Sequence, residues 1–339
     1  MHAPDGFYNT GLCIVMDGVC LGVIAYSVKK VLKKLDRKVV ALAATVGALV
    51  FAVQMANFCV SKGSSCHFMG GVFASIILGP YLSTIMVSIM HLVQVFVFQD
   101  GGVLSLGPNL LTIVIISTFL GYYLYRIFKS LVIEPYGTYI GAFISAWLTL
   151  LITAITVSTM LALSGVDSMA ATLGPMVGPH VLVGAMEGLV TVLLLLVVQR
   201  MSPDLLNASR YYTGKVMPAG YGKSRIKTQH LLLLIALFVG IIFSPFASRN
   251  PDGLEKLALD RGFSETHTTL YYHAPLADYY IPGVENERMS RGCAGFLGTL
   301  ITFSICWGIG MMLARRGKEL TGASNMRCGS EVVGYEKKG

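Results

Sequence analysis

The first two residues of the chain bring together nitrogen atoms that could hold a transition metal. Met1 and His2 offer an α-amine, a backbone nitrogen and an imidazole, and these can chelate one ion in two small fused rings. Deprotonating a backbone amide requires a metal that favours nitrogen in a square plane, which points to Ni(II) or Cu(II) rather than Zn(II). We expect Met1 to be retained, because a residue as large as His2 disfavours removal of the initiator methionine.

A fourth nitrogen is needed to complete a square plane, and His67 is the candidate that the sequence favours. It ends a small polar run, Lys62 to His67, between two apolar segments. If the first segment crosses a membrane and the second returns, this run lies on the same side as Met1. Cys66 is the competing ligand, and its thiolate would favour softer metals.

The elements that would position these residues are apolar segments long enough to cross a membrane. The mean hydropathy of the chain is +0.66, and only 13% of its 339 residues are charged, too few to cover the surface of a soluble domain. A helix needs about 20 apolar residues to span a bilayer. Spans are predicted near 11–28, 39–58, 69–79, 81–98, 107–125, 137–163, 177–199, 229–247 and 294–314. The sequence therefore predicts an all-α polytopic membrane protein whose third segment is too short to cross unaided.

Changes in composition divide the chain into two modules. Residues 1–200 hold seven closely connected segments, and we interpret them as a metal-binding membrane domain. Residues 201–228 are polar, basic and rich in turn-forming residues, so they are predicted to be a cytoplasmic linker. A two-span module, 229–316, follows, with a long polar loop at 249–293 whose Asn, Pro, Asp and Gly residues predict turns. Residues 317–339 form a predicted cytoplasmic tail.

The distribution of basic residues predicts the orientation. Twenty of the 26 Lys and Arg residues fall on one side of the membrane if the spans alternate, in segments 29–38, 126–129, 200–227 and the tail. Only six fall on the other side, five of them in the long loop. Because short cytoplasmic loops concentrate Lys and Arg, the N-terminus is predicted outside and the C-terminus in the cytoplasm of a cell-membrane protein. The net charge of +8 is thus explained without nucleic acid.

Other polar residues are candidates that the sequence leaves open. Glu187 lies inside the seventh segment, and a charge within a membrane is a functional candidate by default, although local pairing near the start of the helix is the commoner explanation. His91 and His180 lie in or beside apolar spans, where packing is the commoner role. The short third segment is broken by Gly70 and Gly71, and such breaks are tolerated only where protein shields them or a cavity is lined.

Several other chemistries find no support in the sequence. There is no phosphate-binding GxxxxGK[ST] motif and no HExxH. We therefore expect no catalytic residue, no organic cofactor and no ATPase within this chain. The seven cysteines form no CxxC pair, and at least three fall in apolar spans, so a disulfide framework is not expected.

Several motifs resemble the substrate-binding M subunit of energy-coupling-factor nickel and cobalt transporters (NikM/CbiM). The stretches that carry the resemblance over residues 1–200 are Met1-His2-x-Pro4-Asp5-Gly6, Ser65-Cys66-His67-Phe68-Met69-Gly70-Gly71, Gln99-Asp100-Gly101-Gly102 with Leu106-Gly107-Pro108-Asn109, and Gly184-Ala185-Met186-Glu187-Gly188-Leu189. The second module, with Pro251-Asp252-Gly253-Leu254-Glu255-Lys256 and Ala277 to Gly283, is similar to the small N subunit of the same systems, here fused.

The resemblance implies a function and a site. It implies a subunit that captures Ni2+ or Co2+ for an ATP-driven importer, with four nitrogen ligands from Met1, His2 and His67. It also implies partners, namely a transmembrane coupling (T/Q) subunit and cytoplasmic ATPase (A/O) subunits. The square-planar nitrogen set favours Ni2+ over Co2+. The alternatives are a standalone secondary metal transporter or channel that uses Glu187 and His91, and a metal-dependent membrane enzyme.

Overall fold

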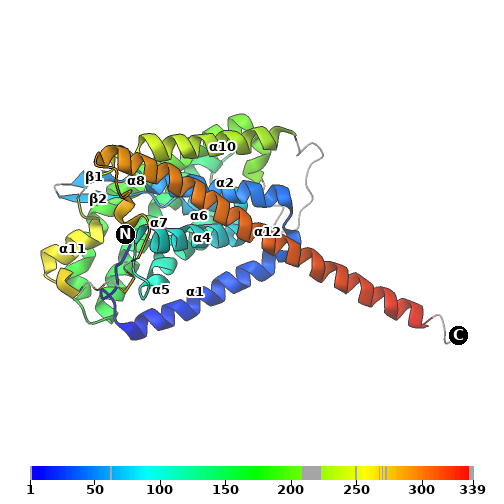
Figure 1. The fold of residues 1–339 in the computed structure, drawn as a ribbon, viewed down its shortest axis with the longest axis horizontal. Helices are drawn as coiled ribbons and strands as arrows, with labels where there is room; N and C mark the ends of the chain where they lie inside the picture. Colours follow the sequence, from blue (N-terminus) through cyan, green and yellow to red (C-terminus); the bar gives the residue numbers. More distant parts are fainter. Residues whose placement is uncertain are drawn as a thin grey trace.

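The structure is a computed structural model, and it describes residues 2–61, 63–207, 223–248, 250–266, 268, 270–271 and 273–335. Eight helices within these residues are long and apolar enough to cross a membrane. Figure 1 shows them packed side by side into one elongated bundle, with the N-terminus folded in at one end and the C-terminus at the far tip of α12. The prediction of an all-helical polytopic protein is confirmed.

The helices follow the predicted apolar segments closely. The long elements are α1 (Thr10–Val31), α2 (Arg37–Gln54), α4 (Pro80–Phe98), α7 (Tyr136–Leu163), α8 (Met169–Met201), α10 (Lys223–Ile242) and α12 (Glu287–Tyr335). One further span is built from α5 (Leu106–Asn109), a π-helical stretch η2 (Leu110–Leu120) and α6 (Gly121–Ser130). Short elements are η1 (Leu32–Lys34), β1 (Phe58–Ser61), β2 (Ser64–Cys66), α3 (Gly71–Leu78), η3 (Pro203–Asn207), η4 (Ser244–Phe246), α11 (Gly253–Arg261), η5 (Ser264–Thr266) and η6 (Ala277–Tyr279).

Two features in this part of the fold differ from the sequence prediction. Helix α8 begins at Met169, capped by Ser168, and continues through Pro175 and Pro179 rather than starting near 177; a membrane helix tolerates prolines because neighbouring groups satisfy the freed backbone. The long loop 249–293 contains the helix α11 as well as turns. Most of the predicted linker 201–228 lies outside the described residues.

Helix α12 is far longer than its predicted span. It has 49 residues, which at 1.5 Å per residue give about 70 Å, against a bilayer core of about 30 Å. Its C-terminal part extends beyond the bundle (Figure 1). A Cβ on Gly317 would clash with the backbone of Leu32, so the start of η1 and α12 are in close contact at this end of the bundle. The basic segments 29–38 and 315–318 therefore lie together.

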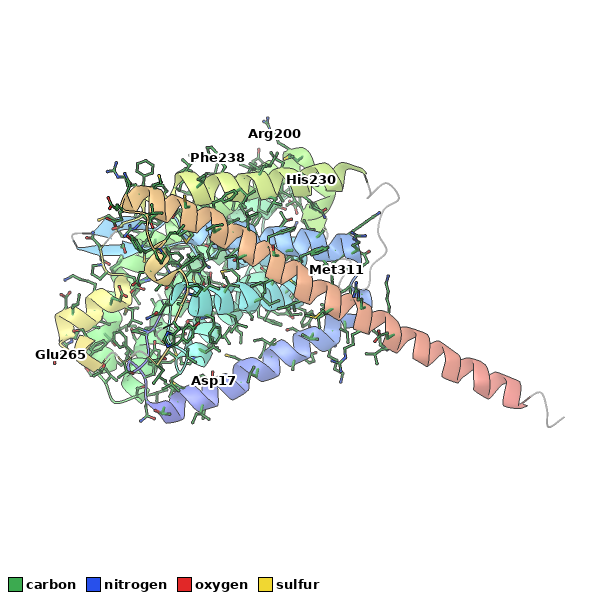
Figure 2. The ribbon with its side chains drawn as sticks, in the orientation of Figure 1. Asp17, Arg200, His230, Phe238, Glu265 and Met311 are labelled. Carbon is green, nitrogen blue, oxygen red and sulfur yellow. The ribbon has the colours of Figure 1, made fainter. Side chains whose placement is uncertain are left out.

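Large apolar side chains cover the outside of the bundle. Ile14 and Leu21 on α1 are 65% and 62% exposed, and Phe238 on α10 is 58% exposed. Figure 2 shows Phe238 on the outer side of α10, away from the other helices. Such a surface is unfavourable in water and suits contact with lipid. By contrast, α2 and α4 are buried along most of their length and form the centre of the core.

The short helix α3 is supported at its N-terminus by Glu187. The two carboxylate oxygens of Glu187 accept hydrogen bonds from the backbone N–H groups of Met69 (2.9 Å) and Gly70 (2.8 Å). A negative charge is stabilising at a helix N-terminus, where backbone N–H groups lack partners inside the helix. Glu187, buried in α8, therefore caps a broken membrane helix.

We expect Glu187→Ala to lower the stability of the protein by about 1–3 kcal/mol, because two buried N–H groups lose their acceptor. The measurement is the thermal unfolding midpoint in detergent. Glu285→Ala is the control, because Glu285 is exposed in the long loop. Equal midpoints for the two variants would contradict the capping role.

Candidate metal centre

His2 lies inside the protein between two other histidines. His2 is only 6% exposed. Its ring stacks on that of His67, with centroids 4.9 Å apart and planes at 26°, and on that of His91, with centroids 5.3 Å apart and planes at 15°. The structure therefore brings together the two predicted imidazoles and adds a third. Met1 lies outside the described residues.

The segment that carries His2 is fixed by hydrogen bonds to α5 and to the loop before it. Ala3 donates its N–H to the side-chain oxygen of Asn109 (2.8 Å), and the Asn109 amide donates back to the Ala3 carbonyl (2.9 Å). Asp5 accepts from the N–H groups of Leu104 (2.7 Å) and Ser105 (3.1 Å). The sequence did not indicate a role for Asn109. In the structure its side chain holds the backbone of Ala3, next to His2.

Gly102 is required for this approach, because a Cβ there would lie 2.0 Å from Oδ1 of Asp5 and 2.4 Å from its backbone nitrogen. We expect Gly102→Ala to displace the N-terminal segment and to weaken metal binding about tenfold, the lower range for disturbing the support of a metal ligand. Calorimetric titration of Ni2+ into the purified chain measures this. Gly174→Ala should bind normally, since a Cβ there meets nothing within 4 Å; equal affinities would contradict the prediction.

Two polar side chains orient the His2 ring. Nδ1 of His2 lies 3.1 Å from Oδ1 of Asp100, and Nε2 lies 3.3 Å from Oε1 of Gln94. The hydroxyl of Tyr279, in η6 of the second module, donates to the other Asp100 oxygen (2.5 Å). Desolvation raises the pKa of Asp100 to about 6, whereas burial holds the pKa of His2 well below its usual value. The His2 imidazole is therefore neutral at pH 7 and available as a ligand.

His67 presents one ring nitrogen to the site. Its Nδ1 lies 2.9 Å from the carbonyl oxygen of Phe68, so Nδ1 carries the proton and Nε2 keeps its lone pair. Burial lowers the pKa of His67 to about 3. Cys66 is oriented differently, with Sγ 3.8 Å from Nε2 of His180, and burial raises the pKa of its thiol to about 11. Only His67 of this pair lies against His2.

The second module covers both segments that carry the histidines. Ser65 in β2 donates its N–H to the carbonyl of Pro251 (2.9 Å), and Thr268 donates its N–H to the carbonyl of Asp5 (2.8 Å). Asp252 begins α11 with a capping box that includes Glu255. The resulting pocket, about 610 Å³ in volume, is lined by residues of both modules, among them His2, His67, Asp100, Asp252, Glu255 and Tyr279.

The sequence identified part of this arrangement. It named His2 and His67, and it placed Asp100 and Asn109 in matching motifs without assigning them roles. It treated His91 as a packing residue, yet the structure stacks His91 on His2. A signal was present, since His91 and Gln94 are polar residues one helical turn apart in an otherwise apolar span.

The sequence profile of the family described as "cobalt uptake substrate-specific transmembrane region" (CbiM) matches residues 2–205, more than half of the chain. The chain belongs to the CbiM family. A second profile, the PDGLE domain, matches residues 227–315 and so covers the second module. The name of that domain corresponds to Pro251-Asp252-Gly253-Leu254-Glu255 in this chain. The predicted fusion of an M-type domain with an N-type module is confirmed.

Relatives of known name support the same membership. A protein of Archaeoglobus fulgidus, provisionally named a fused nickel transport protein, is 29% identical over 90% of this chain and 96% of its own length. The cobalt transport protein CbiM of Kyrpidia tusciae is 26% identical over 61% of this chain and 86% of its own. This member of the CbiM family is therefore a multi-pass membrane protein of metal uptake.

Solved structures show the same fold. One transition metal transporter matches with a TM-score of 0.56 and 24% identity, covering 64% of this chain and all of its own. A truncated transition metal transporter matches with a TM-score of 0.52 and 28% identity, covering 59% of this chain and 99% of its own. The shares of this chain that the two structures cover, 64% and 59%, are similar to the share that lies in the CbiM-family region, residues 2–205.

Proposed function

We propose that this chain captures a divalent transition metal at its outer face, with Ni2+ preferred over Co2+, as the substrate-binding subunit of an ATP-driven importer of the energy-coupling-factor type. The ligands are the Met1 amine, the backbone and ring nitrogens of His2, and Nε2 of His67. The observation that carries this proposal is the stacked pair of His2 and His67 in a pocket where the N-terminal segment is held by Asn109 and Asp5.

Chelation fixes which ring nitrogen of His2 binds the ion. Only Nδ1, the nitrogen nearer the backbone, can close a small ring with the His2 backbone nitrogen. This atom lies 3.1 Å from the Asp100 carboxylate. A bound cation therefore replaces the Asp100 contact at Nδ1 and has a carboxylate beside it, while Gln94 remains in reach of Nε2. The proposed set takes two of its four nitrogens from the terminus and the main chain, and the other two from the rings of His2 and His67.

The preference for nickel follows from the same ligand set. Four nitrogens that include a deprotonated amide impose a square plane, which suits Ni(II) better than Co(II). The test is metal analysis of the purified chain, with an unmodified N-terminus, after exposure to equal concentrations of both ions. Nickel should predominate, and it should show the absorption of a square-planar complex. Equal loading, or an octahedral nickel spectrum, would contradict the ligand set.

Nickel affinity should fall as the pH is lowered from 8 to 6. The Met1 amine, with an ordinary pKa of about 8, and the His2 amide must both lose protons, and each proton released weakens binding roughly tenfold per unit of falling pH. An imidazole with its ordinary pKa of about 6.5 would also become protonated within this range and would lower the affinity further. Because burial lowers the pKa of His67 to about 3, this ring stays neutral over the whole range and adds no loss there. Titration at several pH values measures the slope, and a flat profile would exclude the amine and amide.

The orientation and partners are parts of the same proposal. The N-terminus is outside, because the basic segments 29–38 and 315–318 lie together at the opposite end of the bundle from the pocket and short basic loops mark the cytoplasmic side. A coupling subunit would pack against α1, where Gly18 and Gly22 meet nothing within 4 Å and permit close helix approach. We assign residues 1–200 to metal capture, 201–228 to the linker, 229–316 to the N-type module and 317–339 to the tail.

The rival proposal is a standalone transporter or channel that uses Glu187. Its carboxylate is already engaged by the N–H groups of Met69 and Gly70, which favours a structural role. Uptake of nickel by cells should stop when ATP is depleted or when the ATPase subunits are absent. Uptake by this chain alone, unaffected by ATP depletion, would support the rival.

A further inference from the structure

His91 has a buried ring nitrogen that nothing so far explains. The residue is 0% exposed, and its Nε2 has no hydrogen-bond partner among the residues that the structure describes. Its other nitrogen, Nδ1, lies 3.4 Å from Oε1 of Gln94, at the long limit of a hydrogen bond. A buried polar atom without a hydrogen bond is destabilising, so its presence in a folded protein calls for an explanation, and ligand binding is one.

The position of His91 places that nitrogen behind the proposed metal site. Its ring stacks on the His2 ring at 5.3 Å. His2 and His67 line the outer pocket, whereas His91 is not among the residues that line its described part. Helix α4 ends at Phe98 beside the pocket, and His91 is seven residues earlier, which is about 10 Å deeper along the helix axis. His91 therefore lies next to His2 and deeper along α4 than the end of that helix at the pocket.

Further polar groups continue on the same face of α4. Ser88 is one turn deeper than His91, and its buried Oγ also lacks a partner among the described residues. Thr84, one more turn along, is buried and shares a hydrogen bond with Thr118 at 2.6 Å. Residues three, four and seven apart lie on one side of a helix. A row of buried oxygen and nitrogen atoms thus leads from the site toward the opposite end of the bundle.

We propose that His91 is a second metal-binding residue, the ligand that receives the divalent ion when it leaves His2 and His67 on its way inward. This step rests on the proposed function. It is a ligand exchange without electron transfer: a bond forms between the ion and Nε2 of His91, the bonds to the Met1 amine, the two His2 nitrogens and Nε2 of His67 break, and water molecules take the remaining coordination positions. A water molecule returns the proton to the His2 backbone nitrogen, and the hydroxide that remains is neutralised by the solvent. Neutral imidazole is a ligand that both Ni(II) and Co(II) accept.

The test separates equilibrium binding from transport. His91→Phe keeps a ring that can stack on His2 but removes both nitrogens. We expect the Kd of the purified full-length chain for Ni2+ to stay within about threefold, and nickel uptake by cells that also produce the coupling and ATPase subunits to fall at least about tenfold. His91→Met, with a thioether that can ligate the ion, should recover part of the uptake. Thr302→Val is the control, because Oγ1 of Thr302 is another buried oxygen without a described partner, and its uptake should be normal.

Two results would overturn the proposal. Normal uptake by His91→Phe would show that its nitrogens are not needed. Loss of nickel binding together with uptake, in both the Phe and the Met variant, would make His91 part of the resting site or of its packing. Failure of the proposed function itself is recognised separately, because His67→Ala would then keep full nickel affinity.

Discussion

Adding residues before Met1 is expected to abolish nickel binding, with a loss of affinity of at least about 100-fold. An added residue converts the Met1 amine into an amide and so removes one of four proposed ligands, and loss of a ligand should exceed the 10- to 100-fold cost of losing an outer partner. Burial adds to the effect, since His2 and Ala3 are 6% and 1% exposed and any extension must leave a closed segment. Calorimetric titration of Ni2+ into tagged and untagged protein measures the difference.

The sharpest control is one protein measured twice. An extension that a protease removes to leave Met1 as the first residue should abolish binding before cleavage and restore it afterwards, with terminal sequencing to establish where the chain begins. A tag at the C-terminus should have no effect, because the tip of α12 lies far from the N-terminal segment and α11 (Figure 1). Full affinity in the extended protein would remove the terminal amine from the site.

Replacing His67 by alanine is expected to cost a comparable factor, at least about 100-fold in the Kd for Ni2+. His67 is the side chain that stacks on His2, and the hydrogen bond of its Nδ1 to the Phe68 carbonyl makes Nε2 the nitrogen that carries the lone pair for a metal ion. The ligand-field absorption of the bound ion should change as well, because a water molecule replaces the imidazole as the fourth ligand. Titration followed by absorption records both quantities.

Cys66→Ser provides the matched control for this prediction. Cys66 precedes His67 directly, but its Sγ faces His180, and its pKa of about 11 keeps it a thiol at neutral pH. We expect the serine variant to bind nickel within about threefold of the native chain, as a neighbour outside the ligand set should. Loss of binding in Cys66→Ser with retention in His67→Ala would reverse the assignment.

The membrane spans could be predicted because a bilayer imposes a simple rule on the sequence. Each apolar run became a helix, and the break at Gly70 did mark the start of the short helix α3. The partner that supports this helix could also be suspected, since Glu187 is a lone charge in an apolar span. What the sequence could not supply was the contact between Gly70 and Glu187, because these residues are 117 positions apart in the chain.

The remaining features depend on contacts between distant segments. The hairpin of β1 and β2 is very short, and its backbone pairing extends to Pro251 in the other module. Helix α11 shows no apolar span, only the capping box that begins at Asp252. His91 looks like any histidine in a span until the fold places His2 beside it. Local patterns therefore indicated the ligands, while the surroundings of each ligand required the three-dimensional structure.

The hydrogen bonds from Thr268 to Asp5 and from Ser65 to Pro251 join the two modules beside the site. The presence of both modules on one chain affects how often these bonds form. On separate chains, each pairing would depend on how many copies of both proteins the cell makes. When both modules are on one chain, their pairing is intramolecular, and the effective concentration is set by the connection between them rather than by the number of copies. Closure over His2 then does not depend on expression level, and every copy inserted into the membrane carries its own cover in fixed one-to-one proportion.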